Sequence, residues 1–161
     1  MNSQVTVLKT QSKITSKKPK ILLVEDDLHW QILISAALRS AYSEVDIRCV
    51  KTVQKAEQLL CSGHLFNLII ADQNLQGNKA GIDFWRQCQS NHHSQIPFML
   101  VSGMSETGYH NVFIREEKYP IYMSKPFDIT IFKSIINWQI VENKGLKNSS
   151  KNKLRISKSQ Q

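Results

Sequence analysis

The run Asn67-Leu68-Ile69-Ile70-Ala71-Asp72 decides the fold, because it is a short apolar segment that ends in a carboxylate. Bounded apolar runs of this length are typical of strands that are buried on both faces. Three other apolar runs end in polar side chains in the same way: residues 20–24 before Glu25, residues 97–101 before Ser102, and residues 120–123 before Ser124 and Lys125. If the strands are parallel neighbours, these polar groups meet at one sheet edge, where open α/β sheets bind ligands. The runs predict a site for a divalent cation and a phosphoryl group.

Length and composition indicate one globular domain. The chain has 161 residues, of which 41% are hydrophobic, which is enough for one buried core. The sequence contains no apolar stretch of membrane-spanning length and does not begin with the basic-then-apolar order of a secretory signal. We therefore expect a cytoplasmic protein without membrane contact. Three cysteines, Cys49, Cys61 and Cys88, without a C-x-x-C pair predict reduced, mostly buried thiols rather than disulfides or a zinc site.

The net charge of +8 is located at the two ends of the chain. Residues 1–20 and 143–161 contain eleven lysines and arginines and no acid, which leaves a net charge of −3 for the residues between them. We predict that residues 1–19 and 143–161 are basic disordered tails and that residues 20–142 form the domain. The tail lysines are not interleaved with aromatic residues, so nucleic-acid binding through the tails is the less favoured alternative.

Between the tails, strand-like and helix-like patterns alternate. The predicted strands are residues 21–25, 45–50, 68–72, 98–101 and 121–123. The predicted helices are residues 28–41, 53–61, 81–88 and 106–118, with a last one after Asp128. Thr52 and Asp128 are suited to cap the helices that follow them, and Gly63 is suited to end the second helix. Five β-α units with apolar strands predict an α/β fold, a doubly wound parallel sheet covered by helices on both faces.

The polar groups at the strand ends resemble those of the receiver domain, the phospho-accepting module of bacterial two-component response regulators. Four segments carry the resemblance, in this order: Val24-Glu25-Asp26-Asp27, Asp72, Ser102-Gly103 and Lys125-Pro126-Phe127. The resemblance covers residues 20–142. It implies the flavodoxin-like receiver fold with strand order 2-1-3-4-5, in a chain similar to the stand-alone receivers of chemotaxis.

The resemblance implies a Mg²⁺ site among the acids. Asp26 and Asp72 would be direct ligands together with the backbone carbonyl of Asn74, and Glu25 would act through water. Mutual repulsion among the carboxylates gives a physical reason for a cation, and Mg²⁺ suits one or two carboxylates with several waters. The simpler role for these acids is to cap the helix that follows and to complement its dipole, and for Asp27 we expect only this role.

The resemblance also implies a phosphoryl site with a switch. Asp72 would be the phospho-acceptor, Lys125 would pair with the phosphoryl oxygens, and the Ser102 hydroxyl would donate to one of them. Tyr122 would move inward with Ser102; its simpler role is to pack against the last helix. Trp30 lies on a helix face, where we expect it to contribute to packing.

These roles predict a regulatory phospho-acceptor rather than an enzyme, active only in its own phosphotransfer and autodephosphorylation. The donor would be a phosphohistidine of a histidine kinase or phosphotransfer protein, and output would pass through contact with a further protein. The sequence departs from the family pattern at Gln76, where a proline is common. It also departs at the loop 76–80, whose extra residue resembles receivers of hybrid histidine kinases. The alternative is a phosphorylation-independent interaction module that keeps the acids for folding.

Overall fold

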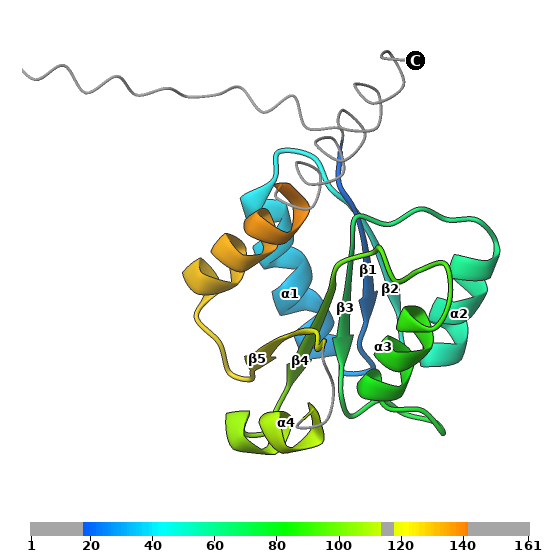
Figure 1. Cartoon of the computed structure of the whole chain (residues 1–161). Helices are drawn as coiled ribbons and strands as arrows, with labels where there is room; N and C mark the ends of the chain where they lie inside the picture. Colours follow the sequence, from blue (N-terminus) through cyan, green and yellow to red (C-terminus); the bar gives the residue numbers. More distant parts are fainter. Residues whose placement is uncertain (1–17, 114–117, 142–161) are drawn as a thin grey trace, which may run out of the picture.

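The structure, a computed structural model, describes residues 18–113 and 118–141 (Figure 1). Both predicted tails lie outside these residues, apart from Lys18 and Pro19. Pro19 is buried, and its carbonyl accepts a hydrogen bond of 2.8 Å from the backbone N–H of Asp46. Pro19 is therefore joined to the sheet. The end of the predicted fourth helix, residues 114–117, also lies outside the described part of the chain.

Five parallel strands form one sheet in the order β2-β1-β3-β4-β5, as predicted. Their bounds are β1 Lys20–Val24, β2 Asp46–Val50, β3 Leu68–Asp72, β4 Phe98–Ser102 and β5 Ile121–Ser124. Each bound differs from the predicted one by no more than one residue. The side chains of β3 and β4 are buried along their whole length, because helices cover both faces of the sheet.

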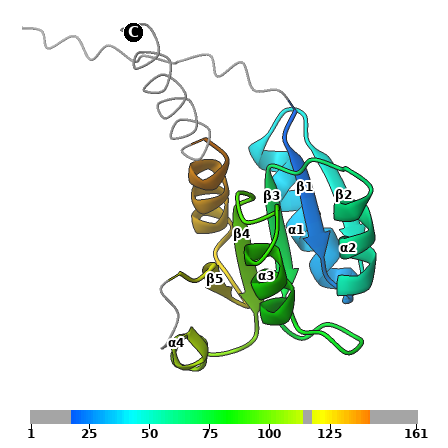
Figure 2. The same ribbon diagram turned by 45° about the vertical axis from the view of Figure 1, so that its right-hand side comes forward.

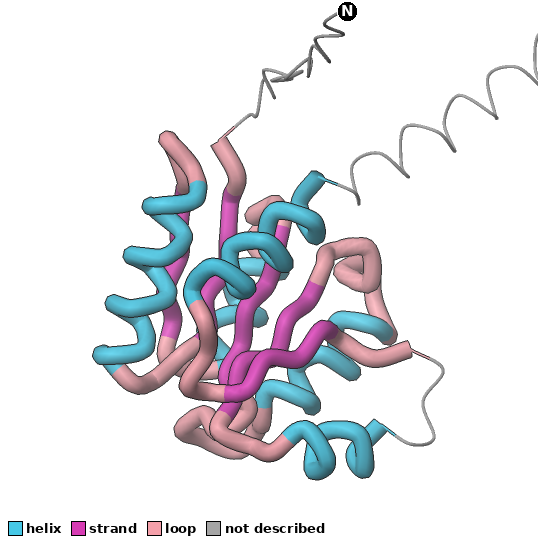
Figure 3. Tube along the Cα trace, turned by 90° about the vertical axis from the view of Figure 1, so that its left-hand side faces the viewer, coloured by secondary structure: helices cyan, strands magenta, loops and turns pink. Residues whose placement is uncertain are grey.

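The helices lie in two groups on opposite faces of the sheet (Figures 1 and 2). Their bounds are α1 Leu28–Ala41, α2 Val53–Cys61, α3 Gly81–Gln89 and α4 Glu106–Phe113, followed by a last helix over residues 129–141. Figure 3 shows α1 and the last helix in front of the strands. None of the described helices is long and apolar enough to span a bilayer.

The two faces of the sheet have different cores. The face under α1 and the last helix is mainly aliphatic, with residues such as Ile34, Leu38 and Ile136. The face under α2, α3 and α4 is rich in aromatic rings, including Phe84 and Trp85. An aromatic core packs through edge and stacking contacts of specific geometry.

The predicted helix ends are confirmed. The Asp27 and Asp128 carboxylates each accept hydrogen bonds from two backbone N–H groups in the first turn of the helix that follows. Thr52 caps α2 through the backbone N–H of Lys55. Gly63 follows the end of α2 with φ of 83°, a left-handed conformation that glycine adopts without strain. These signals are local in sequence, so the sequence alone revealed them.

The prediction of mostly buried cysteines is wrong for two of the three. Cys88 is buried on α3, and burial raises the pKa of its thiol to about 12. Cys49 and Cys61 are exposed, although all three are free thiols. Cys49 lies on β2, an edge strand that is covered less completely than the central strands.

Candidate phosphoryl-acceptor site

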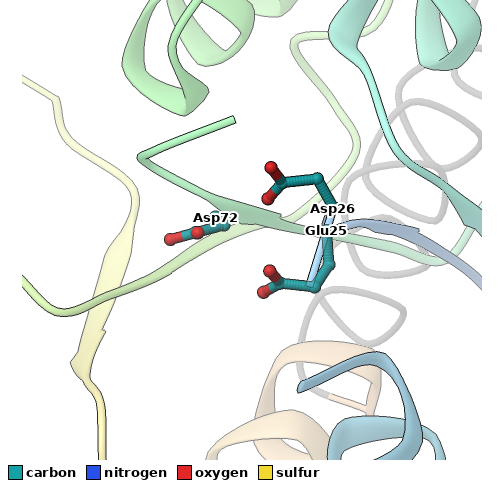
Figure 4. Close-up of side chains that lie close together, drawn as sticks. All are labelled: Glu25, Asp26 and Asp72. Atoms are coloured by element: carbon teal, nitrogen blue, oxygen red, sulfur yellow. The ribbon is translucent and has the colours of Figure 1, made fainter. Parts of the chain in front are cut away.

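The strand register brings three carboxylates together at the carboxyl edge of the sheet. Val24 of β1 pairs with Ala71 of β3, so Glu25 and Asp26 leave β1 beside Asp72 (Figure 4). One carboxylate oxygen from each of the three acids lies within 4.8 Å of the others. Their mutual repulsion requires a positive charge nearby or a shift of protonation.

Asp72 is held by close backbone packing at the end of β3. A Cβ atom at Gly81 would lie 2.2 Å from the Asp72 carbonyl oxygen, so only glycine allows α3 to begin there. The amide side chain of Gln73 accepts a hydrogen bond of 2.9 Å from Ile82 N–H and joins the loop to α3. The Asp72 side chain is 10% exposed, and its Oδ1 is buried without a hydrogen-bond partner in the described part of the chain.

Lys125, the residue directly after β5, reaches into the acid cluster. Its Nζ lies 2.6 Å from Glu25 Oε2 and 3.4 Å from Asp72 Oδ2, and its side chain is 8% exposed. Burial raises the pKa of Glu25, while the hydrogen bond and charge of Lys125 act in the opposite direction. Glu25 is thus engaged by the lysine, an ion pair that the sequence did not reveal because the partners are a hundred residues apart.

Asp26 also borders the loop that follows β3. It is half-buried and lines a hollow of about 490 Å³ with the loop 73–80, which includes the exposed Asn74. Lys79 anchors this loop to α2 through an ion pair of 2.6 Å with Glu57. The structure therefore places Asn74 beside Asp26, and the longer loop is fixed by a contact of its own.

Asp27 does not join the cluster. Its Oδ1 accepts hydrogen bonds from the N–H groups of His29 (2.8 Å) and Trp30 (3.1 Å). Mainly the Trp30 N–H lowers the pKa of Asp27, because it stabilises the charged carboxylate. The predicted capping role of Asp27 is confirmed.

Ser102 of β4 and Tyr122 of β5 lie next to one another, with 3.4 Å between the Tyr122 hydroxyl and the Ser102 carbonyl oxygen. Ser102 is fully buried, and its Oγ accepts a hydrogen bond of 3.2 Å from Met104 N–H. The Tyr122 hydroxyl donates to the Met104 carbonyl, and its ring stacks on Tyr109 of α4 at 4.4 Å between centroids. The simpler alternative for Tyr122, packing against the last helix, does not hold, because its ring joins the aromatic core on the opposite face of the sheet.

The family model of the response regulator receiver domain matches residues 21–137 of this chain. The chain belongs to this family. It is therefore a receiver domain of the kind used in two-component signalling, with the fold that its residues predicted. Among curated protein sequences, none matches the chain.

Solved receiver domains share the fold at low sequence identity. The receiver domain of a sensor histidine kinase from Pseudomonas aeruginosa is 22% identical, with a TM-score of 0.65; the match covers 77% of this chain and 98% of that one. Its crystal structure contains a magnesium ion coordinated in the active-site cleft. The signal receiver domain of an HD-domain protein from Pseudomonas fluorescens is 18% identical, with a TM-score of 0.70 and coverages of 83% and 94%. A receiver protein from Pseudomonas putida is 20% identical, with a TM-score of 0.64 and coverages of 76% and 98%.

Proposed function

We propose that this receiver domain accepts a phosphoryl group on Asp72 from a phosphohistidine of a histidine kinase or phosphotransfer protein in the cytoplasm. The observation that carries the proposal is the Asp72 carboxylate itself. It is nearly buried, one of its oxygens lacks a hydrogen-bond partner among the described residues, and the other lies 3.4 Å from the Lys125 ammonium. A buried carboxylate oxygen without a partner is costly, and an incoming electrophile or cation removes that cost.

The reaction needs one bond to form and one to break. An Asp72 carboxylate oxygen attacks the phosphorus atom, and the N–P bond of the phosphohistidine breaks with its electron pair returning to the imidazole nitrogen. The product is an acyl phosphate on Asp72, and the donor histidine is regenerated. Lys125 Nζ pairs with the phosphoryl oxygens, and Ser102 Oγ donates a hydrogen bond to one of them. Water later attacks the phosphorus, the bond between phosphorus and the Asp72 oxygen breaks, and the step restores the carboxylate and releases inorganic phosphate.

The residues present fit a Mg²⁺ ion. Three carboxylates converge on one space, and the buried ammonium of Lys125 balances only part of their charge. Asp26, Asp72 and the Asn74 backbone carbonyl would hold the ion, and Glu25 would act through water while it keeps its pair with Lys125. When bound, Mg²⁺ would neutralise the acids and the phosphoryl oxygens. Oxygen ligands of this kind are the ones that Mg²⁺ prefers.

The effect of phosphorylation would pass from the site to the surface through β4 and β5. Lys125 N–H donates a backbone hydrogen bond of 2.7 Å to the Ser102 carbonyl, which ties β5 to the end of β4. A phosphoryl group that engages Ser102 and Lys125 would therefore act on both strands. Tyr122, through its bond to the Met104 carbonyl, would carry the change to the start of α4. We propose that a protein partner reads this region.

The test is Mg²⁺-dependent phosphorylation with a small-molecule phosphodonor. The wild-type chain should gain one base-labile phosphoryl group by mass spectrometry, and Asp72→Asn should gain none. Glu44→Gln is the matched control, because Glu44 is an exposed acid away from the site. Stoichiometric labelling of Asp72→Asn, or labelling that persists with a chelator, would contradict the proposal. No labelling of the wild type would favour the phosphorylation-independent interaction module.

A further inference from the structure

The Lys125 ammonium has an aromatic neighbour besides its two carboxylates. Its Nζ lies 4.8 Å from the centroid of the Trp30 ring, over the face of the indole. Trp30 is half-buried and the Lys125 side chain is 8% exposed, so water screens this contact only partly. A cation over an indole face within about 6 Å is attracted by the ring, and the attraction grows as water is removed.

Trp30 is held in place from two directions. It is the third residue of α1, where its backbone N–H donates to the Asp27 cap at 3.1 Å. Its ring contacts Phe127 at 5.6 Å between centroids, and Phe127 stacks on the buried Phe132 of the last helix at 5.0 Å. The indole therefore connects the start of α1 to the segment that directly follows Lys125.

The indole and the carboxylates act differently on the ammonium. Glu25 and Asp72 attract Lys125 through charge, and any cation that binds the acids weakens that attraction. The ring face carries no charge for a cation to neutralise, so its attraction for Lys125 persists. Because the indole ring stays attractive, it keeps the Lys125 ammonium directed at Asp72 while the charges around the ammonium change.

We propose that Trp30 is a positioning residue for Lys125, one that keeps the ammonium beside Asp72 for the incoming phosphoryl group. The inference rests on the proposed phosphorylation of Asp72 and deepens it. Trp30 acts through Lys125 and does not touch the reacting atoms. The simpler role for Trp30 is that it fills space between α1 and Phe127, and the test has to separate the two.

Three variants make the separation. Trp30→Leu keeps an apolar side chain and removes the π face, whereas Trp30→Phe keeps a π face in a smaller ring. Trp138→Leu is the control for loss of a tryptophan, because Trp138 is 55% exposed on the last helix. Circular dichroism checks the folding of each variant. If Trp30→Leu does not fold, Trp30→Met serves the same comparison, because a flexible thioether side chain fills irregular gaps.

The readout is the phosphorylation rate with a small-molecule phosphodonor at saturating Mg²⁺, analysed as separate kcat and KM. Trp30→Leu should lower kcat about three- to tenfold, the range expected for a partly desolvated cation–π contact. Trp30→Phe should restore most of the rate, and Trp138→Leu should not change it. In a Lys125→Ala background, Trp30→Leu should have no further effect, because the group it positions is gone.

Two results overturn the inference. One is a Trp30→Leu variant with the wild-type kcat. The other is that Trp30→Leu lowers kcat by the same factor in the wild-type and Lys125→Ala backgrounds, which indicates that Trp30 acts only through packing. If the wild-type chain takes up no phosphoryl group, that result overturns the proposed function, and the positioning role of Trp30 with it. An independent measurement checks the contact: the Lys125 Cε protons should show an upfield ring-current shift by NMR that is lost in Trp30→Leu and kept in Trp30→Phe.

Discussion

The acid half of the site, carried by β1 and β3, can be compared with the response half, carried by β4 and β5. Around the acids the backbone is packed so closely that a Cβ at Gly81 would meet the Asp72 carbonyl at 2.2 Å. At Gly103, directly after β4, a Cβ would find nothing within 4 Å. β1, β3 and β4 each have a strand on both sides, whereas β5 is an edge strand of four residues, so the open part of the response half is β5 and the loop after β4.

This difference matches the two tasks of a receiver. Nucleophilic attack and metal binding need groups fixed within a fraction of an ångström, and densely packed central strands provide that. A response needs an element with a second arrangement of similar free energy, and open regions with fewer buried contacts provide it. The edge strand and the loosely surrounded Gly103 lie where such movement costs least.

The largest difference in stability between the two halves should appear when a methyl group is added to one glycine of each half. Gly81→Ala should lower the free energy of unfolding by about 2–3 kcal/mol, because the new Cβ displaces the Asp72 backbone. Gly103→Ala should change it by less than about 0.5 kcal/mol. Urea unfolding of both variants measures the difference. Equal losses in the two variants would remove the distinction between a tight and an open half.

Magnesium affinity should fall when the acid half is altered and not when Lys125 is removed. Asp26→Ala should weaken Mg²⁺ binding at least about tenfold, because a proposed direct ligand is lost. Lys125→Ala should bind Mg²⁺ no more weakly than the wild type, since it removes a competing positive charge 3.4 Å from Asp72. Isothermal titration calorimetry gives both constants. Wild-type affinity in Asp26→Ala would show that the ion lies elsewhere.

Lys125→Ala should separate phosphorylation from response. The acids and the metal ligands remain in this variant, so Asp72 should still be labelled. The phosphoryl group loses its partner directly after β5, so NMR shift changes at Tyr122 on phosphorylation should fall below about half of the wild-type changes. Changes of wild-type size around Tyr122 would contradict the role of Lys125.

The smallest effect should come from the helix caps, in which the two halves are alike. The N–H groups of Ile131 and Thr130 lower the pKa of Asp128, as those of Trp30 and His29 lower the pKa of Asp27. A lowered pKa means that the charged carboxylate stabilises the fold above its unfolded-state pKa, and that this contribution is lost as pH falls through the folded-state value.

Asp128→Ala should therefore lower the melting temperature slightly at about pH 6, and the difference from wild type should narrow as pH approaches about 3. Asp128→Asn is the matched control, because it keeps a capping oxygen without the charge. Thermal unfolding followed by circular dichroism measures both. A difference that grows toward acid pH would contradict the assigned cap.

Most of the fold could be predicted because its signals are local. Apolar runs gave strand positions to within one residue, and Asp27, Thr52 and Asp128 marked the starts of helices. The strand order came from the resemblance of the polar strand ends to receivers. The environment of the edge strand β2 was not predicted, so Cys49 proved exposed. Exposure depends on which elements cover a residue, and periodicity alone does not specify that.

The sequence by itself determined the α/β fold and the polar residues that end the strands, because a buried parallel strand requires an apolar run and each run here stops at a polar group. Only the tertiary structure decided which of these groups touch. It paired Lys125 with Glu25, stacked Tyr122 on Tyr109, and laid the Lys125 ammonium over the Trp30 ring. The physical reason is that these contacts join residues far apart in the chain, and their distances depend on how helices pack on the sheet.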